Sequence, residues 1–424
     1  MLTRNLPILK EMFQDRRYRE FIFELDELLR TDPNYDARKL TRILEGTARG
    51  EKIVRFGDRW VISSFVPPVP SRAFMTFIKG GVDKDSLYTD LAHARRSAPL
   101  SVHVCITSRC PFRCEHCGAT YSPGRAELTK DEWIQVIHDL QDFGVACIVF
   151  SGGEPLVRDD MEEIISAVDD RSSTLLFTNG ACLSLERARA LKEAGLFMLA
   201  VSIDSPIPEE QNRLRGNPNA FSYATEAVRN ASEAGLYTLV SSVVYRKNLN
   251  KDNLHRIFEL AKEHGAHEVR IHQPIPRGEL TDPKDAEQIF LTPEDRTRLY
   301  RIQIAANQTN NGIPKVSSFP YTEGQCKFGC GAGNLHSYIS STGELWPCDF
   351  VPLSFGNVVT EDLKEVYGRM MQVAGNPRQN CIARAVGEKI RGRELPISGE
   401  ECADLCTACQ SQSFPRFFKD LQAP

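Results

Sequence analysis

The positions of the cysteines constrain this chain more than any other feature of its sequence. Of its 13 cysteines, four lie in one short segment and seven lie after residue 325. They are Cys105, Cys110, Cys114 and Cys117, and then Cys326, Cys330, Cys348, Cys381, Cys402, Cys406 and Cys409. No secretory signal is expected, because the apolar stretch from Leu6 to Leu9 runs straight into charged residues. So many thiols without such a signal favour metal ligation or catalysis over a disulfide framework.

Composition and charge narrow the possible classes of function. The chain has 424 residues, 41% hydrophobic and 25% charged, which suits one large core with one or two smaller ones. A formal net charge of -4 gives no global basic field, so no nucleic-acid partner is expected. No window approaches the roughly 20 apolar residues of a membrane span. We therefore expect a cytoplasmic protein without a membrane span.

Alternating strand and helix patterns predict an α/β core. Strand-like runs are Leu100 to Ile106, Ala146 to Ser151, Thr174 to Thr178, Phe197 to Ile203, Leu236 to Val244 and Glu268 to His272. Helical patterns lie between them, and Thr129 and Glu132 have the spacing of a capping box. Such alternation predicts a parallel sheet with right-handed crossovers. Periodicity does not decide between a barrel and an open sheet.

Two further domains are expected around this core. Residues 1–95 contain a helical pattern from Leu9 to Leu29 and a predicted β-hairpin that turns at Gly57-Asp58. The polar stretch from Ala306 to Gln325 predicts a linker. The sequence thus predicts an N-terminal helical and hairpin domain at 1–95, the core at 96–305 and a cysteine-rich domain at 306–424.

The first cysteine group has the spacing Cys-x3-Cys-x2-Cys at Cys110, Cys114 and Cys117. It follows the first predicted strand, where loops at the C-terminal ends of strands build active sites. Three thiolates on one loop can hold three irons of a four-iron cluster and leave the fourth iron open to a cofactor or substrate. The alternative is a structural zinc site completed by Cys105 or His116. Cys105 lies within the strand and is expected to be a core residue.

This triplet resembles the signature of radical S-adenosylmethionine (SAM) enzymes, with His116 where that family frequently has an aromatic residue. The resemblance implies a partial (β/α)6 barrel of the TIM type and an oxygen-sensitive [4Fe-4S] cluster. In that family the open iron chelates the amino and carboxylate groups of SAM. One electron then cleaves SAM to methionine and a 5'-deoxyadenosyl radical, which abstracts a substrate hydrogen. An electron donor such as flavodoxin or ferredoxin is expected as a partner.

Further segments similar to this family follow in order along the chain. Ser151 to Pro155 is similar to the segment whose backbone and glutamate hold the SAM amino group. The segments from Ser202 to Ser205 and from Arg213 to Gly216 resemble others that lie near SAM, although Gln211 and Asn212 replace the commoner His-Asp pair. Thr178-Asn179-Gly180 either contacts the cofactor or forms a tight turn. The candidate cofactor-binding residues are therefore Gly152, Gly153, Glu154, Pro155, Ser202, Asp204 and Arg215.

The second cysteine group is similar to the auxiliary-cluster domain called SPASM. Cys330-x12-Gly343-x4-Cys348 matches the opening of that domain, and the residues between predict a hairpin. The resemblance implies one or two auxiliary iron-sulfur clusters held by Cys326, Cys330, Cys348, Cys381, Cys402, Cys406 and Cys409. The middle segment of that family is not present here, so the assignment of thiols to clusters stays open. One or two structural zinc ions are the alternative.

Asp349 follows Cys348 in a segment that looks like one in anaerobic sulfatase-maturating enzymes, where the equivalent aspartate is a candidate base. Capping of a turn is the alternative role. The sequence therefore predicts a radical SAM oxidoreductase that oxidises or cross-links a peptide or protein substrate, with auxiliary clusters handling electrons. The same chemistry on a small molecule such as a tetrapyrrole, lipid or sugar derivative is one alternative. A non-catalytic zinc or electron-transfer protein is the other.

Overall fold

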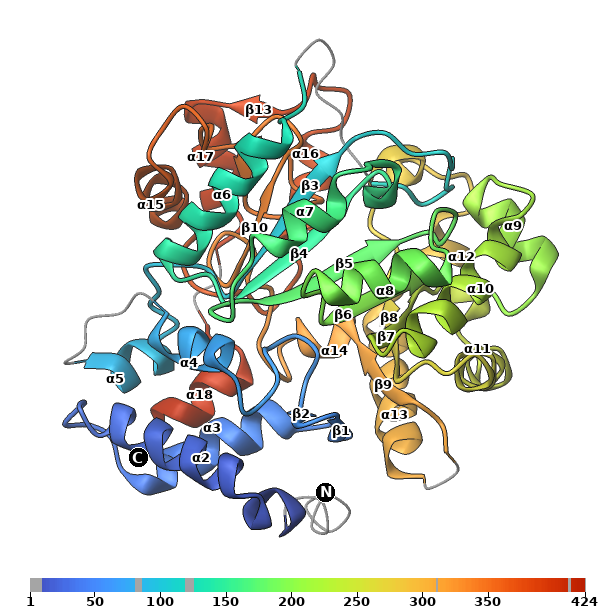
Figure 1. The fold of residues 1–424 in the computed structure, drawn as a ribbon. Coiled ribbons are helices and arrows are strands. Elements are labelled where there is room, and N and C mark those ends of the chain that lie inside the picture. Colours follow the sequence, from blue (N-terminus) through green and yellow to red (C-terminus); the bar gives the residue numbers. More distant parts are fainter. Residues whose placement is uncertain (1–9, 81–85, 119–125, 310–311, 411–412, 424) are drawn as a thin grey trace.

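The computed structural model describes residues 10–80, 86–118, 126–309, 312–410 and 413–423, and a curved, mostly parallel sheet lies at its centre (Figure 1). The nine strands run in the order β11-β10-β3-β4-β5-β6-β7-β8-β9. All six strands expected from the sequence are present and pair in parallel. They are β3 (Ser101–Thr107), β4 (Cys147–Gly152), β5 (Ser173–Thr178), β6 (Met198–Ser202), β7 (Tyr237–Val243) and β8 (Glu268–His272). The predicted α/β core is therefore confirmed.

Helices cover the outer face of this sheet. The helices that follow the strands are α6 (Lys130–Phe143), α7 (Met161–Ser166), α8 (Leu185–Glu193), α9 (Pro208–Arg215), α10 (Ala220–Glu233), α11 (Lys251–Glu263), α12 (Ala286–Ile289) and α13 (Pro293–Gln308). The helix α12 is not part of this cover, because its Ala286 and Glu287 line the cavity. The predicted capping box starts α6, where Thr129 and Glu132 exchange hydrogen bonds. Outward strand residues such as Phe150 and Leu199 pack with these helices in the main core. Their alternation with inward residues follows from the two-residue period of a strand.

The inward face of the sheet holds a small apolar cluster, and this cluster borders a large cavity. Val149 and Met198, in the first halves of their strands, form a core cluster with Val61 of β2. Ser151 and Ser202, in the second halves, line a large cavity. The functional end of the sheet is therefore the C-terminal end of its strands, as in other β/α folds.

The N-terminal residues form helices around a small hairpin. The elements are α2 (Arg16–Leu29), α3 (Ala37–Ala48), β1 (Val54–Phe56), β2 (Arg59–Val61), α4 (Arg72–Lys79) and α5 (Leu87–Ala92). The predicted hairpin is confirmed, because Phe56 pairs with Arg59 across Gly57-Asp58. The predicted first helix is interrupted at Asp15, whose side chain caps α2, and its expected start at Leu9 lies outside the described residues. Through Val61 the hairpin joins the apolar cluster of the inward face.

The prediction of a linker between Ala306 and Gln325 is wrong. β9 (Lys315–Ser318) extends the sheet beside β8, and α14 (Phe319–Thr322) follows it, while residues 310 and 311 lie outside the described part. The stretch resembles a linker in the sequence because it is polar. In the fold its polar groups are buried, and their hydrogen-bond partners lie far away in the sequence. Ser317 donates to Glu268, and Ser318 donates to Gln303 at 2.6 Å. A buried polar side chain that is satisfied by tertiary hydrogen bonds is stable inside a sheet.

The C-terminal residues return to both earlier parts of the chain. Their elements are β10 (His336–Ile339), β11 (Leu345–Trp346), β12 (Leu353–Ser354), α15 (Leu363–Ala374), α16 (Ile382–Lys389), β13 (Ile397–Ser398), α17 (Glu400–Thr407) and α18 (Arg416–Gln422). The predicted hairpin is confirmed as β10 and β11, and β10 also pairs in parallel with β3. Phe417 and Leu421 of α18 join the N-terminal core, beside α3 and α5 (Figure 1). Among the described residues, we find no helix with the length and apolar character to cross a bilayer.

A buried ion cluster ties the N-terminal part to the sheet. The Glu51 carboxylate lies 2.8 Å from the Lys315 ammonium and also contacts that of Lys327. Lys315 donates a further hydrogen bond to the carbonyl oxygen of Ile62 at 2.6 Å. Burial raises the pKa of Glu51, but the two ammonium groups outweigh that effect and hold the pKa below its usual value. Glu51 is therefore a buried anion that pairs with two buried cations.

We predict that Glu51→Gln strongly destabilises the fold. The amide leaves two buried ammonium groups without a counter-charge, a change that typically costs about 3–5 kcal/mol. Urea denaturation under anaerobic conditions measures the loss as a lower midpoint. Glu20→Gln is the matched control, since Glu20 pairs with Arg16 on the exposed surface, where ion pairs add little. Equal midpoints for the two variants would contradict a stabilising role for the buried cluster.

Candidate active site

Both cysteine groups face one cavity on the inward face of the sheet. Its volume is about 1310 Å³, which exceeds the usual size of a small-molecule site. Cys110, Cys114 and Cys117 line it from the loop after β3. Cys330, Cys348 and Cys381 line it from the C-terminal part. The folded chain thus brings two groups of thiols, far apart in sequence, to the wall of a single chamber.

Two glycines, Gly152 at the end of β4 and Gly153 just after it, allow the cysteine loop to lie against the end of that strand. A Cβ atom at Gly152, where φ is +141°, would meet the carbonyl oxygen of Thr107 at 2.4 Å. A Cβ atom at Gly153 would meet the carbonyl oxygen of Arg109 at 2.4 Å. The Gly153 amide donates to Thr107 at 2.8 Å, and the Glu154 amide donates to Arg109 at 2.9 Å. In this structure the two glycines let the backbone of the cysteine loop approach closely, because they have no Cβ atom.

The Glu154 carboxylate joins the ends of two neighbouring strands. It accepts hydrogen bonds from the Thr178 hydroxyl at 2.8 Å and from the Asn179 amide at 2.7 Å. Burial raises the pKa of this carboxyl group. The Asn179 side-chain amide lies 3.8 Å from the sulfur of Cys110. The segment at 178–180 therefore connects Glu154 to the first thiol of the triplet, a contact that local turn chemistry does not reveal.

A buried ion pair supports the second thiol of the triplet. Arg215 forms an ion pair with the Asp204 carboxylate at 2.7 Å and donates one hydrogen bond to it at 2.9 Å. Burial raises the pKa of Asp204, but the Arg215 guanidinium outweighs it and holds the pKa below its usual value. A third guanidinium nitrogen lies 3.9 Å from the sulfur of Cys114. Asp204 and Arg215, predicted near SAM, thus form a positioning network for the cysteine loop.

Two residues that depart from the family pattern have defined places in the structure. Gln211 accepts hydrogen bonds from the amides of Asp204 and Ser205 and donates to the carbonyl oxygen of Ser202 at 3.0 Å. It therefore shapes the turn after β6. His116 lies with its Nε2 atom 3.5 Å from the Asp204 carboxylate, and burial lowers its pKa to about 4. His116 is therefore a neutral side chain beside the Asp204 carboxylate.

The C-terminal thiols divide into two groups. The first is Cys330, Cys348 and Cys381 on the cavity wall, where a hydrogen bond from Cys381 holds the pKa of Cys330 below its usual value. The second is Cys402, Cys406 and Cys409 on and just after α17, where Cys402 and Cys406 are buried. Arg378 lies 4.0 Å from the sulfur of Cys406. Cys326 is exposed. Groups of thiols with N–H donors beside them fit iron-sulfur clusters, whose sulfur ligands accept such bonds.

Asp349 lies beside two histidines that the sequence did not single out. Its carboxylate is 3.5 Å from His336 Nε2 and 3.8 Å from His103 Nδ1. It also accepts a hydrogen bond from the Cys348 thiol at 3.1 Å. Burial raises the pKa of Asp349, but the histidines outweigh it and hold the pKa below its usual range. Burial lowers the pKa of His103 to about 3, so this ring is neutral.

Comparison with known families agrees with this arrangement. The radical SAM superfamily matches residues 104–261, and an iron-sulfur cluster-binding domain of the SPASM type matches residues 330–410. The chain belongs to the radical SAM superfamily and carries a C-terminal SPASM domain. It is a radical SAM enzyme whose cofactors are a [4Fe-4S] cluster, SAM and auxiliary iron-sulfur clusters. The alternative of a non-catalytic zinc protein is therefore set aside.

Similar proteins differ in what they act on. An AdoMet-dependent heme synthase of Methanosarcina barkeri is 29% identical over 293 residues, which cover 65% of this chain and 83% of that protein. A PqqA peptide cyclase of Granulibacter bethesdensis is 33% identical over 176 residues, which cover 41% of this chain and 46% of that protein. The crystal structure of Streptococcus suis SuiB bound to the precursor peptide SuiA has a TM-score of 0.54 at 16% identity, covering 66% of this chain and 67% of SuiB. The last likeness shows the shared fold.

We predict that Gly153→Ala displaces the cysteine loop and lowers the iron content of the reconstituted protein. The added methyl group would overlap backbone oxygens at 2.4 and 2.6 Å, and backbone cannot move aside as a flexible side chain can. Gly368→Ala is the matched control, because a Cβ atom there meets nothing within 4 Å in the helix α15. Iron counting after anaerobic reconstitution measures both. Wild-type iron content in the Gly153→Ala protein would contradict the proposed role of this contact.

Proposed function

We propose that this enzyme removes a hydrogen atom from a peptide or protein side chain and oxidises or cross-links that side chain. The observation that carries the proposal is the single cavity, which is lined by both groups of thiols and by the Asp349 carboxylate. When bound, the [4Fe-4S] cluster and SAM supply the 5'-deoxyadenosyl radical that begins such chemistry. A substrate in this cavity meets residues from the core and from the SPASM domain together.

The residues of the chain would divide the work as follows. Cys110, Cys114 and Cys117 would hold the first cluster. Gly152, Gly153, Glu154, Pro155 and Ser202 line the cavity near that loop and would bind SAM. Asp204 and Arg215 would act as positioning residues, since their charges are already paired with each other. Binding SAM on fixed groups at the strand ends places the reacting atoms without further reorganisation.

Asp349 would take the proton that the oxidised substrate releases. Its carboxylate is ionised, lies on the cavity wall and is 31% exposed there. A general base must be within hydrogen-bond reach of the proton that it accepts, and a group on the wall of the substrate chamber meets that condition. Cys330, Cys348 and Cys381 would hold an auxiliary cluster that handles electrons. Cys402 and Cys406 on α17, together with Cys409, would hold a second auxiliary cluster. A flavodoxin or ferredoxin would supply the reducing electron.

A tetrapyrrole is the second candidate substrate. It is favoured by the heme synthase of Methanosarcina barkeri, because the match covers 83% of that protein. The peptide candidate is supported by the PqqA peptide cyclase and by the peptide bound to SuiB. Arg296 and Arg384 line the cavity and suit carboxylate groups of either substrate. Anaerobic titration with a carboxylated tetrapyrrole, monitored by the absorption band of the tetrapyrrole, separates the two candidates. Binding favours the tetrapyrrole, and no binding favours the peptide.

We predict that the reduced, reconstituted protein cleaves SAM to 5'-deoxyadenosine and that Cys110→Ala abolishes this reaction. The substitution removes one of three thiolates, so the cluster that reduces SAM is lost. Cys182→Ala is the matched control, since Cys182 lies apart from both groups of thiols in the sequence. Chromatography of the products measures the nucleoside. Zinc in place of iron, or full cleavage by the Cys110→Ala protein, would contradict the assignment of the first cluster.

We predict that Asp349→Asn retains cleavage of SAM but loses product formation by about 100-fold or more. An amide cannot accept the substrate proton, and loss of a general base typically costs factors of 10² to 10⁴. Asp252→Asn, at an exposed position of α11, controls for the substitution itself. Mass spectrometry of the substrate measures product, and 5'-deoxyadenosine is measured in the same sample. A parallel loss of both products would instead place Asp349 in the binding of SAM.

A further inference from the structure

Three potential metal ligands converge on the cavity wall away from the cysteines of the first cluster. They are His103 on β3, His336 on β10 and Asp349 after β11. One ligand atom from each lies within 4.8 Å of the other two. The histidine nitrogens are 3.5 and 3.8 Å from the carboxylate oxygens, longer than good hydrogen bonds. These separations lie near the roughly 3.4 Å between two ligands of one tetrahedral ion at about 2.1 Å bond length.

The pairing of two strands builds this group of side chains. β10 lies parallel to β3, with His336 opposite Ser101 and Tyr338 opposite His103. Because alternate residues share a face, both histidines point inward, and their ring centroids are 4.4 Å apart. The β10–β11 hairpin then returns the chain so that Asp349 reaches the same place. The strand register therefore fixes three side chains that no local motif groups together.

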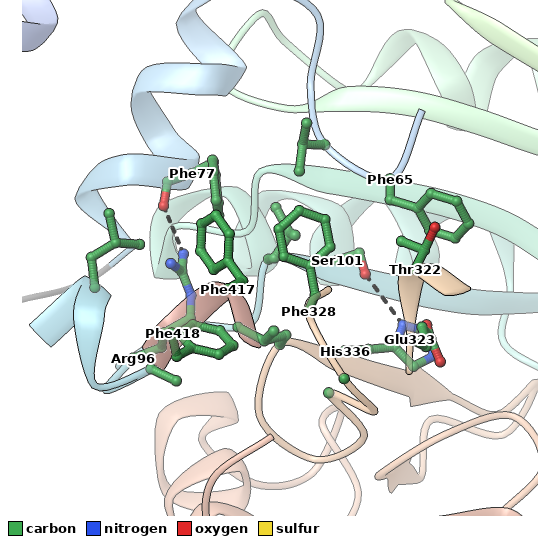
Figure 2. Close-up of a pocket in the computed structure, with 17 residues that line it drawn as sticks. Phe65, Phe77, Arg96, Ser101, Thr322, Glu323, Phe328, His336, Phe417 and Phe418 are labelled. Atoms are coloured by element: carbon green, nitrogen blue, oxygen red, sulfur yellow. Dashed lines mark hydrogen bonds between the residues drawn. The ribbon is translucent and has the colours of Figure 1, made fainter. Parts of the chain in front are cut away.

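A hydrogen bond outside the group orients the His336 ring. Its Nδ1 atom lies 3.2 Å from the Ser101 hydroxyl, as Figure 2 shows at the edge of a neighbouring small pocket. When Nδ1 donates to Ser101, the lone pair of Nε2 faces the Asp349 carboxylate. Histidines that bind metals usually have such a partner on the second ring nitrogen. Ser101 can thus accept a hydrogen bond from Nδ1 while Nε2 binds a metal ion.

We infer that His103, His336 and Asp349 bind one divalent transition-metal ion, separate from the irons held by the cysteines. Two histidines and one carboxylate are a donor set that suits ferrous iron and leaves coordination positions open. All three residues line the cavity, so these positions face the space that a substrate enters. The ion would hold an oxygen or nitrogen atom of the substrate and ease its deprotonation. In the loaded enzyme one carboxylate oxygen of Asp349 would bind the ion, and the other oxygen would take the substrate proton.

The test uses manganese(II) as a probe of the reconstituted holoenzyme, washed with chelator and kept anaerobic with its clusters in the diamagnetic oxidised state. Free Mn²⁺ gives an electron paramagnetic resonance signal that falls when the ion is bound. We expect one bound Mn²⁺ per chain, displaced by Fe²⁺ or Zn²⁺, which bind such sites more tightly. His336→Gln and Asp349→Asn are each expected to weaken binding by about 100-fold or more. Ser101→Ala is expected to weaken it by about 10-fold, as loss of an outer hydrogen bond does.

His272→Gln is the matched control, because His272 is another inward histidine on the cavity wall that lies outside this group. It should bind Mn²⁺ like the wild type. The iron content of each variant shows whether its clusters are intact. If His336→Gln fails to load iron, the Mn²⁺ affinity of Ser101→Ala is compared with that of the wild type instead. Equal Mn²⁺ binding by the wild type, His336→Gln and Asp349→Asn, or no binding below millimolar concentration, overturns the inference. Cleavage of SAM without substrate does not need this ion, so that assay tests the proposed function separately.

Discussion

The parallel pairing of β10 with β3 is the contact on which the functional part of this molecule depends. It adds a strand from the C-terminal domain to the first strand of the barrel, so two parts of the chain share one sheet. Backbone hydrogen bonds fix this contact in both distance and register, unlike a contact between two separate surfaces. The thiols that follow β3 and those that flank the β10–β11 hairpin consequently meet one cavity. A substrate between them is within reach of both.

The inward face of the sheet shows how the chain keeps such a cavity open. Apolar side chains fill part of this face, where Val61 of the N-terminal hairpin packs against Val149 and Met198. Other inward positions carry serine, arginine and histidine, and His103 lies level with Val149. Arg270 on β8 stays buried because its guanidinium donates to the carbonyl oxygen of Ser64 at 2.9 Å and lies over the Phe65 ring. Buried charges and polar groups of this kind are stable only with partners, and the N-terminal segment provides them.

Much of the core could be predicted because its signals are local. The strands β3 to β8 are apolar runs at regular spacing, and Thr129 with Glu132 marks the start of α6 within one turn. β9 was missed for the opposite reason. Its Ser317 is polar and inward, and it is satisfied by Glu268, which lies 49 residues away in the sequence. A polar strand looks like a loop when its partners are remote.

The sequence by itself determined the class of chemistry and the likeness to radical SAM enzymes, because Cys110, Cys114 and Cys117 lie close enough together to ligate one cluster from a single loop. It also indicated that the later cysteines serve further metal chemistry. Only the tertiary structure decided which of those thiols face the substrate cavity and that His103 and His336 lie beside Asp349. The physical reason is the separation in sequence between the residues that interact. Short spacings are set by the covalent chain, whereas the register of β10 on β3 is set by packing and hydrogen bonds between residues 235 positions apart, such as Ser101 and His336.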